Sequence, residues 1–295
     1  MKHPQTNIAA TIILYNPENN IYDNINSYAN EVGKLIVVDN STMHNKDLIK
    51  KLQSSFKNIE YINNNSNLGI ATALNIGCEK AIELGYDWIL TMDQDSRFLN
   101  FSKYIQCLEN IPYPNSTAII AANTLWHADQ HLPVNPTYTY EEKFLVITSA
   151  NFLNLTLFNK IGQFDDKLFI DMVDHDYCIR ANIHKYKILY FKDILVEHSL
   201  GSLFQRKNIF TGKIRNKIEH SPQRAYYITR NTFHLWKNYS KLFPKEFNLL
   251  KTINIIFIHE VTKIIIYEDQ KIKKLYAKLL GLYHFMRGNF GKYTI

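Results

Sequence analysis

The chain has 295 residues, 46% hydrophobic and 21% charged, which is typical of a folded protein with a sizeable core. Its three cysteines, Cys78, Cys107 and Cys178, are scattered, which argues against a disulfide framework or a zinc site and is typical of a reducing cytosol. The polar start predicts no secretory signal, and the absence of any run of 18 apolar residues predicts no membrane-spanning helix.

The charge is unevenly distributed along the chain. Residues 1–200 contain 16 basic and 22 acidic side chains, whereas residues 201–295 contain 18 basic and 5 acidic ones. A basic segment attached to a mildly acidic body predicts an anionic partner, which can be nucleic acid, a phospholipid surface or a phosphorylated substrate. Charge alone does not choose among these three.

The first hundred residues predict strands that alternate with helices. Short apolar runs that end in polar residues predict buried strands at 8–15, 34–41, 59–63 and 88–92. Periodic apolar residues predict the intervening helices at about 18–32, 45–56 and 67–84. This alternation indicates an α/β fold with a parallel sheet. Neither a G-x-G-x-x-G after the first strand nor a Walker sequence is present, which disfavours a dinucleotide oxidoreductase or a P-loop ATPase.

The middle of the chain is less regular. We expect strands at 118–125 and 144–150, separated by a polar loop, and a short helix from 154 to 161 that ends at Gly162. A helix over 173–183 and two edge segments, at 187–190 and 195–196, complete this part.

Asp93 and Asp95 directly follow the fourth predicted strand. Ligands of open α/β sheets bind beyond the carboxyl ends of the strands, so these carboxylates are placed to hold a hard divalent cation and, through it, substrate phosphates. The alternative interpretation is a strand that ends in an Asx-rich turn.

A second acidic cluster lies between residues 165 and 176. Asp171 and Asp174 are close enough in sequence for like charge and partial burial to raise the proton affinity of one, which suits a general base. On the predicted helix, Asp176 and Arg180 have the i,i+4 spacing of an ion pair. The alternative is an acidic helix start that is stabilised by the helix dipole and has no catalytic role.

Several motifs together resemble one family. A first strand with an Asn-Pro exit is followed by V-V-D-N-S, N-x-G-x-A-x-x-x-N-x-G, D-Q-D-S and F-I-D-x-V-D-x-D-x-C-x-R. In this order the motifs resemble the inverting family 2 glycosyltransferases, most closely the bacterial rhamnosyltransferase branch, over residues 8–240. The resemblance implies a GT-A fold, with a mostly parallel central sheet flanked by helices. It implies a nucleotide-binding half at about 1–100, an acceptor half at 101–240, and a basic helical extension at 241–295.

The resemblance also assigns residues to the nucleotide-sugar donor. Asp39 would accept a hydrogen bond from the imide N–H of a uracil or thymine base, and Tyr15 and Asn16 would border that base. Three further residues would line the nucleotide side, and they are Asn67, Gly69 and Asn75. The glycine would permit close approach of the backbone.

The same comparison implies a divalent cation, Mg²⁺ or Mn²⁺. Asp93 would contact the ribose or deoxyribose and the metal region, and Asp95 would bind the cation that bridges the diphosphate. His198 resembles a further metal ligand of several relatives, although a hydrogen-bonded structural histidine is an equally simple interpretation.

Asp174 falls where the family places its catalytic base. It would deprotonate an acceptor hydroxyl, which attacks the anomeric carbon in line as the nucleoside diphosphate leaves. Many relatives have Glu-Asp where this chain has Val173-Asp174, so Asp171 is the second candidate for this role.

The run R-x-Y-Y-x-x-R-N at 224–231 also resembles the family. It would direct four side chains toward the donor diphosphate or the acceptor, and they are Arg224, Tyr227, Arg230 and Asn231. Arginine suits phosphate because its planar fork binds two oxygens at once. The alternative is a helix whose arginines only pair with surface acids.

The last fifty residues predict amphipathic helices. Residues 247–282 alternate apolar positions with many lysines, a pattern typical of helices that lie on a membrane surface. The alternative is a pair of helices that pack on the core or on a second protomer, which would make the protein a homodimer.

Together these expectations describe an inverting transferase of L-rhamnose from dTDP-L-rhamnose in surface-polysaccharide or O-antigen synthesis. The acceptor would be a glycan, most simply one linked to polyprenyl diphosphate, and the enzyme would be cytoplasmic and peripheral on the inner face of the bacterial membrane. The same chemistry with a UDP-hexose or UDP-N-acetylhexosamine donor is the alternative. A non-catalytic glycan-binding or nucleic-acid-binding protein is a third hypothesis. The nucleic-acid version is disfavoured because the basic segment has no base-stacking motif and the acidic cluster would have no role.

Overall fold

The computed structural model describes residues 7–18, 21–125, 137–198, 204–207, 212, 214–217 and 219–294. It divides into two compact units, of which the N-terminal unit contains residues 1–165 and 174–199. The C-terminal unit contains residues 166–173 and 200–295. This division differs from the expected boundary at residue 240, because the helix that precedes residue 240 packs with the last helix of the chain.

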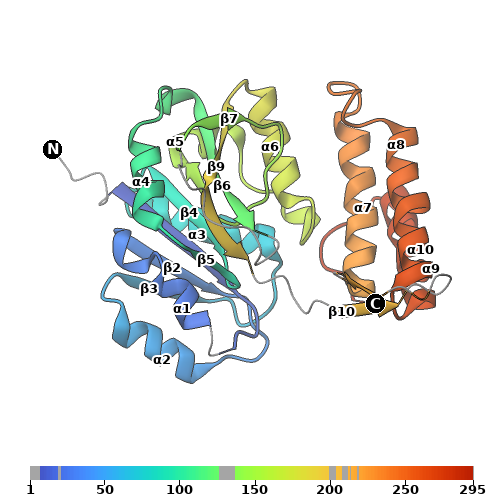
Figure 1. Ribbon diagram of the computed structural model, residues 1–295, viewed down its shortest axis with the longest axis horizontal. Helices are drawn as coiled ribbons and strands as arrows, with labels where there is room; N and C mark the ends of the chain where they lie inside the picture. The colour runs from blue at the N-terminus through green and yellow to red at the C-terminus, as the bar shows by residue number, and fades with distance from the viewer. Residues whose placement is uncertain are drawn as a thin grey trace. The chain divides into compact units, whose positions relative to one another are not determined.

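The N-terminal unit is built on a mixed sheet (Figure 1). Its path through the described residues runs β3-β2-β1-β4-β8-β6-β9-β5, and β7 also pairs with β9. The strands are β1 (Ile8–Leu14), β2 (Lys34–Asp39), β3 (Ile59–Asn63), β4 (Trp88–Asp93), β5 (Ser96–Phe98), β6 (Thr117–Leu125), β7 (Tyr140–Glu142), β8 (Asn151–Asn154) and β9 (Lys187–His198). The first four strands are parallel, which confirms the prediction for this half.

The other half of the sheet departs from the predicted pattern. β8 pairs antiparallel with both β4 and β6, so the strand expected at 144–150 was wrong and pairing starts at Asn151. The reason is local: Ala150 has a φ of 62°, which interrupts the extended chain just before β8. β9 is a single strand paired on both sides, not two edge segments.

Helices cover the sheet of the N-terminal unit, and asparagine side chains begin several of them. Asn45, Asn100 and Asn154 each accept a hydrogen bond from a main-chain N–H in the first turn that follows. The helices are α1 (Ile21–Asn26), α2 (Lys46–Ser55), α3 (Ile70–Glu83), α4 (Phe101–Glu109), α5 (Leu155–Ile161) and α6 (Val173–Ile183). Short 3-10 turns occur at Ala29–Glu31, Pro114–Ser116 and Asp166–Leu168.

One glycine sets the distance between α3 and the sheet. A Cβ atom on Gly77 would lie 2.3 Å from Thr11 Oγ1 of β1, so no larger residue fits without displacing the helix. Part of the N-x-G-x-A-x-x-x-N-x-G motif is therefore explained by packing. The core that this packing closes includes Ile12, Leu35, Val37, Leu90 and Phe152, each fully or almost fully buried.

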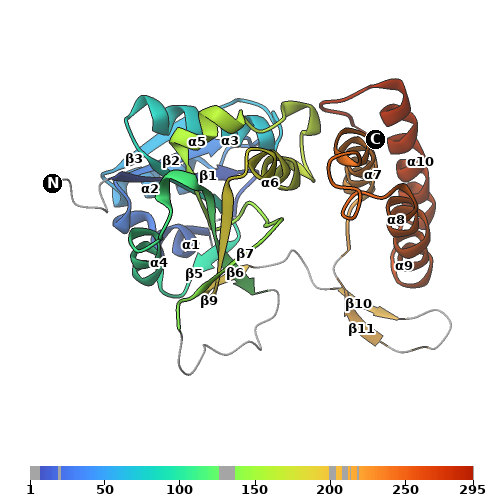
Figure 2. The same ribbon diagram turned by 90° about the horizontal axis from the view of Figure 1, so that it is seen from above.

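The C-terminal unit is mainly helical (Figure 2). It contains β10 (Phe204–Lys207), β11 (Ile214–Lys217), α7 (Pro222–Tyr239), α8 (Leu249–Ile253), the π-helical turn η5 (Asn254–His259), α9 (Glu260–Tyr267) and α10 (Lys271–Arg287). Gly281 permits the close contact of α10 with α7, because a Cβ atom there would lie 2.6 Å from Tyr226 O. The expected helical C-terminal region is confirmed.

Helix α10 has an unusual distribution of polar and apolar side chains. Two of its lysines are buried: Lys274 is 2% exposed and forms ion pairs with Glu219 and Glu268, and Lys278 is 1% exposed. Lys278 Nζ lies 3.5 Å from Thr229 Oγ1. Burial lowers the pKa of Lys278 to about 8, although Glu260 and Glu268 act in the opposite direction.

Replacement of Lys278 by methionine is expected to stabilise the protein at pH 7. A lysine whose pKa falls from 10.5 to about 8 on folding costs up to about 3 kcal/mol of unfolding free energy while it is charged in both states. As pH rises from about 8 to 10.5, the folded form loses its proton first, so the wild type recovers this energy and the gap between the proteins closes. Circular dichroism melts from pH 7 to 10.5 measure the gap. Lys273→Met, at an exposed lysine of the same helix, serves as control, and an equal effect of both variants would contradict this account.

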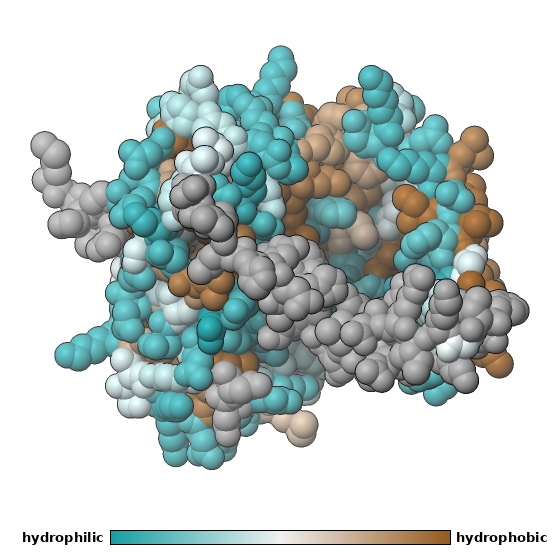
Figure 3. All heavy atoms as spheres, in the orientation of Figure 1, coloured by the Kyte–Doolittle hydropathy of each residue, from teal (hydrophilic) through white to brown (hydrophobic). Residues whose placement is uncertain are grey.

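The outer surface of α10 is apolar. Ile272, Tyr276, Leu279, Tyr283 and Met286 are each at least half exposed, and they recur at alternating spacings of four and three residues, which places them on one face of the helix. Exposed apolar side chains also occur on α8 and η5, notably Leu250 and Ile258, and Figure 3 shows apolar patches over these helices. Among the described residues, none of the helices is long and apolar enough to cross a membrane.

Candidate donor and metal site

Three parallel strands of the N-terminal unit deliver polar residues to one edge of the sheet. In the register of the sheet, Leu14 lies beside Asp39, and Ile13 lies beside Asp93. The loops after β1, β2 and β4 therefore begin at the same edge, which is where α/β proteins bind nucleotides.

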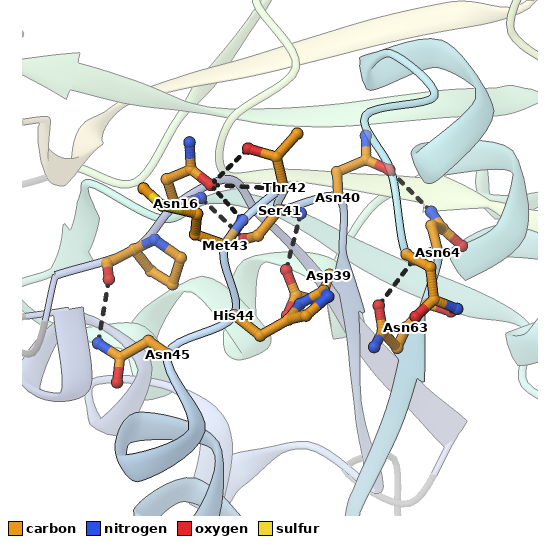
Figure 4. Close-up of polar contacts among 12 residues, drawn as sticks. Asn16, Asp39, Asn40, Ser41, Thr42, Met43, His44, Asn45, Asn63 and Asn64 are labelled. Carbon is orange, nitrogen blue, oxygen red and sulfur yellow. Dashed lines mark hydrogen bonds and ion pairs between the residues drawn. The ribbon is translucent and has the colours of Figure 1, made fainter.

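Asp39 is the centre of the hydrogen bonds at the end of β2 (Figure 4). Its carboxylate is fully buried and accepts hydrogen bonds from Ser41 N at 2.9 Å and Tyr61 Oη at 2.7 Å, and it contacts His44 Nδ1 at 3.0 Å. Burial alone would raise the pKa of Asp39, but these hydrogen bonds outweigh it and hold the pKa below its ordinary value. Asp39 is therefore a rigid, ionised acceptor at neutral pH.

The loop after β1 is tied to both neighbouring loops. Asn16, with a φ of 45°, accepts hydrogen bonds through Oδ1 from Thr42 N and Met43 N, each at 3.2 Å (Figure 4). Tyr15 N donates to Gln94 Oε1 at 2.9 Å, which ties the first loop to the Asp-Gln-Asp turn. Tyr15 itself is 47% exposed, so its ring is free to meet a ligand.

Asp93, Asp95 and His198 form a cluster at this edge. One potential ligand atom from each residue lies within 4.8 Å of those of the other two. In the described part of the chain, this is the group of three such residues that could hold a metal ion. β5 and β9 bring His198 opposite Ser96 in an antiparallel register, so a residue more than one hundred positions away reaches the aspartates. The expected proximity of these three side chains is thus present in the structure.

The donor set fits a divalent cation. Burial raises the pKa of Asp95 above its ordinary value, although the nearby His198, 3.4 Å away, acts in the opposite direction. A raised carboxylate pKa means that the surrounding protein does not fully compensate the charge, which a bound cation would do. Two carboxylates and an imidazole suit Mg²⁺ or Mn²⁺, with the remaining positions open to phosphate oxygens or water.

Two buried serines form hydrogen bonds with members of this cluster. Ser96 Oγ lies 2.6 Å from His198 Nδ1 and 2.7 Å from Ser149 Oγ, and Ser149 Oγ accepts from Asp93 N at 3.3 Å. Both serines are buried, so they orient the histidine and the start of the turn. Ser149 had no signal in the sequence, whereas Ser96 belongs to the D-Q-D-S motif. His44, Tyr61 and Gln94 were likewise not singled out, and the partners of Tyr61 and Gln94 lie far away in sequence.

The three residues expected to line the nucleotide side have structural partners. Asn67 Oδ1 accepts from Gly69 N at 2.9 Å, and Gly69, with a φ of 91°, begins α3 and offers its carbonyl to Asn40 at 2.9 Å. Asn75 is 4% exposed and exchanges two hydrogen bonds, each of 2.9 Å, with the main chain of Phe164. Asn75 therefore fastens α3 to the segment that precedes the acidic cluster.

Asp174 lies in the first turn of α6. It is partly exposed, and its Oδ1 accepts from His175 N at 2.8 Å. Asp176, by contrast, is buried and pairs with Arg180 at 2.8 Å, which confirms the predicted i,i+4 ion pair. Arg180 also donates to the carbonyls of Ile161 and Gly162, so this pair has a structural role.

The other candidate base, Asp171, belongs to the C-terminal unit. Its side chain is 7% exposed and pairs with Arg224, whose own side chain is 46% exposed. Tyr227, Arg230 and Asn231, expected at a ligand surface, instead face the interior of this unit and are fully buried. The reason is that they lie on the side of α7 that meets residues 167–171 and α10.

The chain is similar to a known family and to one of its named members. Residues 10–150 match the model of the glycosyl transferase family 2. The chain is 31% identical to the dTDP-rhamnosyl transferase RfbF of Shigella flexneri over 310 aligned residues, which cover 97% of each protein.

Solved structures share the fold. TarS residues 1–349 from S. aureus, in complex with UDP-GlcNAc, superposes with a TM-score of 0.58 at 14% identity, covering 96% of this chain and 81% of that one. A longer TarS structure, with a TM-score of 0.57 at the same identity, is matched over 48% of its length. The mannosyltransferase PcManGT from Pyrobaculum calidifontis, in complex with GDP-Man and Mn²⁺, gives a TM-score of 0.55 at 10% identity, with coverage of 95% and 75%.

The fold, the polar edge of the sheet and the cluster of Asp93, Asp95 and His198 define a glycosyltransferase of the GT-A type. The similarity to the dTDP-rhamnosyl transferase over 97% of both chains then identifies the branch of the family. The chain belongs to glycosyltransferase family 2, in its rhamnosyltransferase branch.

Proposed function

We propose that the protein transfers L-rhamnose from dTDP-L-rhamnose to a hydroxyl group of a glycan acceptor, with inversion at the anomeric carbon. The observation that carries this proposal is the 31% identity to a dTDP-rhamnosyl transferase over 97% of both chains. A match over nearly the whole length includes the acceptor half and the C-terminal helices, as well as the nucleotide-binding strands.

The end of β2 supports recognition of the thymine base. Asp39 is held ionised by Ser41 and Tyr61, so it is a strong acceptor for an imide N–H once a base displaces or joins one of its partners. Tyr15, exposed at the end of β1, borders the same edge and offers an aromatic surface to the base.

The metal cluster supports recognition of the diphosphate. Asp93, Asp95 and His198 would hold the cation, which supplies positive charge to the departing diphosphate when it is bound. The main chain of the Asp-Gln-Asp turn is fixed by Gln94 and by Asn24, whose Nδ2 donates to Gln94 O at 2.9 Å. The aspartates are therefore held in place before a ligand arrives.

In the reaction, Asp174 takes the proton of the acceptor hydroxyl. The acceptor oxygen forms a bond to the anomeric carbon of rhamnose while the bond from that carbon to the diphosphate oxygen breaks. Attack from the face opposite the leaving group inverts the anomeric centre. The partial exposure of Asp174 agrees with a base that must be reached by a large sugar acceptor.

Binding of the donor tests the assignment directly. dTDP-rhamnose, UDP-glucose, UDP-GlcNAc and UDP-galactose are added separately, each with and without Mg²⁺ or Mn²⁺, and the melting temperature is recorded. A donor at 100 times its dissociation constant is expected to stabilise the folded protein by about 2.7 kcal/mol. We expect dTDP-rhamnose with metal to give the largest increase. A response confined to a UDP-sugar would replace the rhamnosyl donor by a UDP-hexose or UDP-N-acetylhexosamine, with the fold and chemistry unchanged.

We also propose that the acceptor is lipid-linked and that α8, η5 and α10 contact the membrane surface. The exposed apolar residues of these helices, among them Leu250, Ile272 and Leu279, are accompanied by exposed basic residues such as Lys251 and Lys273. Apolar side chains that enter the headgroup region, next to cations that attract anionic lipid, are typical of peripheral helices.

Flotation with vesicles tests this contact. The wild type is expected to float with vesicles that contain phosphatidylglycerol, whereas the double variant Ile272→Glu/Leu279→Glu is expected to lose most of this binding. Met43→Glu, at an exposed apolar residue of the N-terminal unit, serves as the matched control. Loss of self-association, without any change in flotation, would assign the apolar face to a homodimer instead.

A further inference from the structure

The loop of residues 167–172 has an uncommon main-chain conformation. Phe169, Asp171 and Met172 have φ values of 65°, 63° and 65°, in the left-handed region that residues with a Cβ atom rarely adopt. Phe169 and Met172 do not belong to the types that tolerate this region best, which are glycine, asparagine and aspartate. Such a conformation persists only where the surrounding structure holds it in place.

Two adjacent residues of α7 provide this support. Asn231 Nδ2 lies within hydrogen-bond distance of three carbonyl oxygens of the loop, those of Leu168 at 2.9 Å, Ile170 at 2.8 Å and Asp171 at 2.9 Å. Arg230 Nη2 donates to the carbonyls of Lys167 and Leu168, each at 3.0 Å. The main-chain oxygens of the loop are thus satisfied by side chains rather than by a helix or a sheet.

Arg230 and Asn231 are themselves held rigidly. Arg230 Nε donates to Asn231 Oδ1 at 2.9 Å, and its guanidinium lies 4.9 Å from the ring centre of Tyr227. Arg230 Nη1 donates to Gly291 O at 2.8 Å, and Gly291 N donates to Lys167 O at 2.8 Å. Both side chains are fully buried, so their hydrogen bonds to the loop are made away from water.

The loop carries the Asp171 carboxylate and leads directly into α6. Asp171 pairs with Arg224, and Asp174 follows three residues later in the first turn of α6. A change in the main chain at residues 168–171 therefore moves the Asp171 carboxylate directly.

We propose that Arg230 and Asn231 are positioning residues, which fix the conformation of residues 167–172 and thereby the carboxylate of Asp171, one of the two candidate catalytic bases. This role rests on the proposed transferase function. It differs from the contact with diphosphate or acceptor that the sequence suggested for the same two residues, because a fully buried side chain that already donates to the loop acts on the substrate only through the loop.

The variant Asn231→Asp tests the proposal with little change in shape. Aspartate keeps the oxygen that accepts from Arg230 but places a second oxygen against the three loop carbonyls, so the donated hydrogen bonds are lost. Asn238→Asp, at an exposed asparagine of the same helix, is the matched control. Hydrogen exchange of peptides that cover residues 166–174, steady-state kinetics and donor binding are measured for all three proteins.

We expect the Asn231→Asp loop amides to exchange about tenfold faster or more, and kcat to fall by about tenfold or more, while the dissociation constant of the donor changes less than about twofold. A purely structural role would not separate kcat from donor binding in this way. Unchanged exchange would overturn the support of the loop, and faster exchange with unchanged kcat would overturn its role in catalysis. If the wild type neither binds nor uses dTDP-rhamnose, the proposed function fails, and the exchange data still decide whether the two residues hold the loop.

Should Asn231→Asp unfold the protein, Arg230→Lys provides a second variant. Lysine keeps the charge but cannot donate at once to the carbonyls of Lys167, Leu168 and Gly291 as the arginine fork does. The same separation of kcat from donor binding is expected, and equal losses in both quantities would contradict the proposal.

Discussion

Replacement of Asp174 by asparagine is expected to lower kcat by about 10²- to 10⁴-fold, the contribution that a general base makes to proton transfer. Asparagine has nearly the same shape and can still accept from His175 N, so the start of α6 should be preserved. Because the proposed donor site lies at the ends of β1, β2 and β4, the dissociation constant of dTDP-rhamnose should be little changed. Initial rates with a glycan acceptor and thermal-shift titration of the donor measure the two quantities.

Asp171→Asn distinguishes the two candidate bases. Asp171 is almost buried and paired with Arg224, so we expect its replacement to have a smaller effect on kcat than that of Asp174. If Asp171→Asn abolishes transfer and Asp174→Asn leaves it largely intact, the roles of the two residues are reversed. Asp176→Asn is a less suitable control, because it breaks the buried ion pair with Arg180 and is expected to destabilise the N-terminal unit.

Replacement of Asp95 by asparagine is expected to reduce the affinity for Mg²⁺ or Mn²⁺ by about 100-fold and to remove most transfer activity at low metal concentration. Burial raises the pKa of Asp95, so its surroundings do not fully compensate its charge, and we expect its loss to affect the cation more than the fold. Titration of activity and of donor binding with metal gives the affinity.

A matched variant separates this effect from a general loss of negative charge. Glu83→Gln, at an exposed carboxylate of α3, should leave the metal titration unchanged. Activity of the wild type that survives complete chelation would contradict the metal requirement. An Asp95→Asn protein with an unchanged metal titration would remove Asp95 from the ligand set.

The sequence was a good guide to features that depend on neighbouring residues. Apolar runs followed by aspartate or asparagine predicted β1 to β4, and the expected helix at 173–183 coincides with α6. Asp93 and Asp95 were predicted as a cation site from their place after the fourth strand. His198 came from the family resemblance, because the pairing of β5 with β9 that brings the histidine to the aspartates leaves no periodic pattern in the chain.

Other features depended on contacts that no local pattern reports. An arginine followed by an asparagine on a helix looks the same in sequence whether it faces a phosphate or a buried loop, and only the exposure of Arg230 and Asn231 distinguishes these cases. The apolar residues 144–150 satisfied the pattern of a strand, but the left-handed Ala150 and the pairing of Asn151 with Thr91 displaced the strand toward the C-terminus. Likewise, the lysines of α10 suggested a solvated face, yet two of them are buried.

Residues 166–173 belong to the C-terminal unit although they interrupt the sequence of the N-terminal one. A chimera that exchanges the whole C-terminal unit with that of a relative therefore needs two exchanged segments, residues 166–173 and residues 200–295. A chimera joined at residue 200 would combine the loop of one parent with the α7 and Gly291 of the other, and so mismatch Arg230 with the carbonyls that it must meet. Chimeras that also exchange residues 166–173 should retain activity, because the loop of residues 167–172 then keeps the arginine and asparagine that hold it.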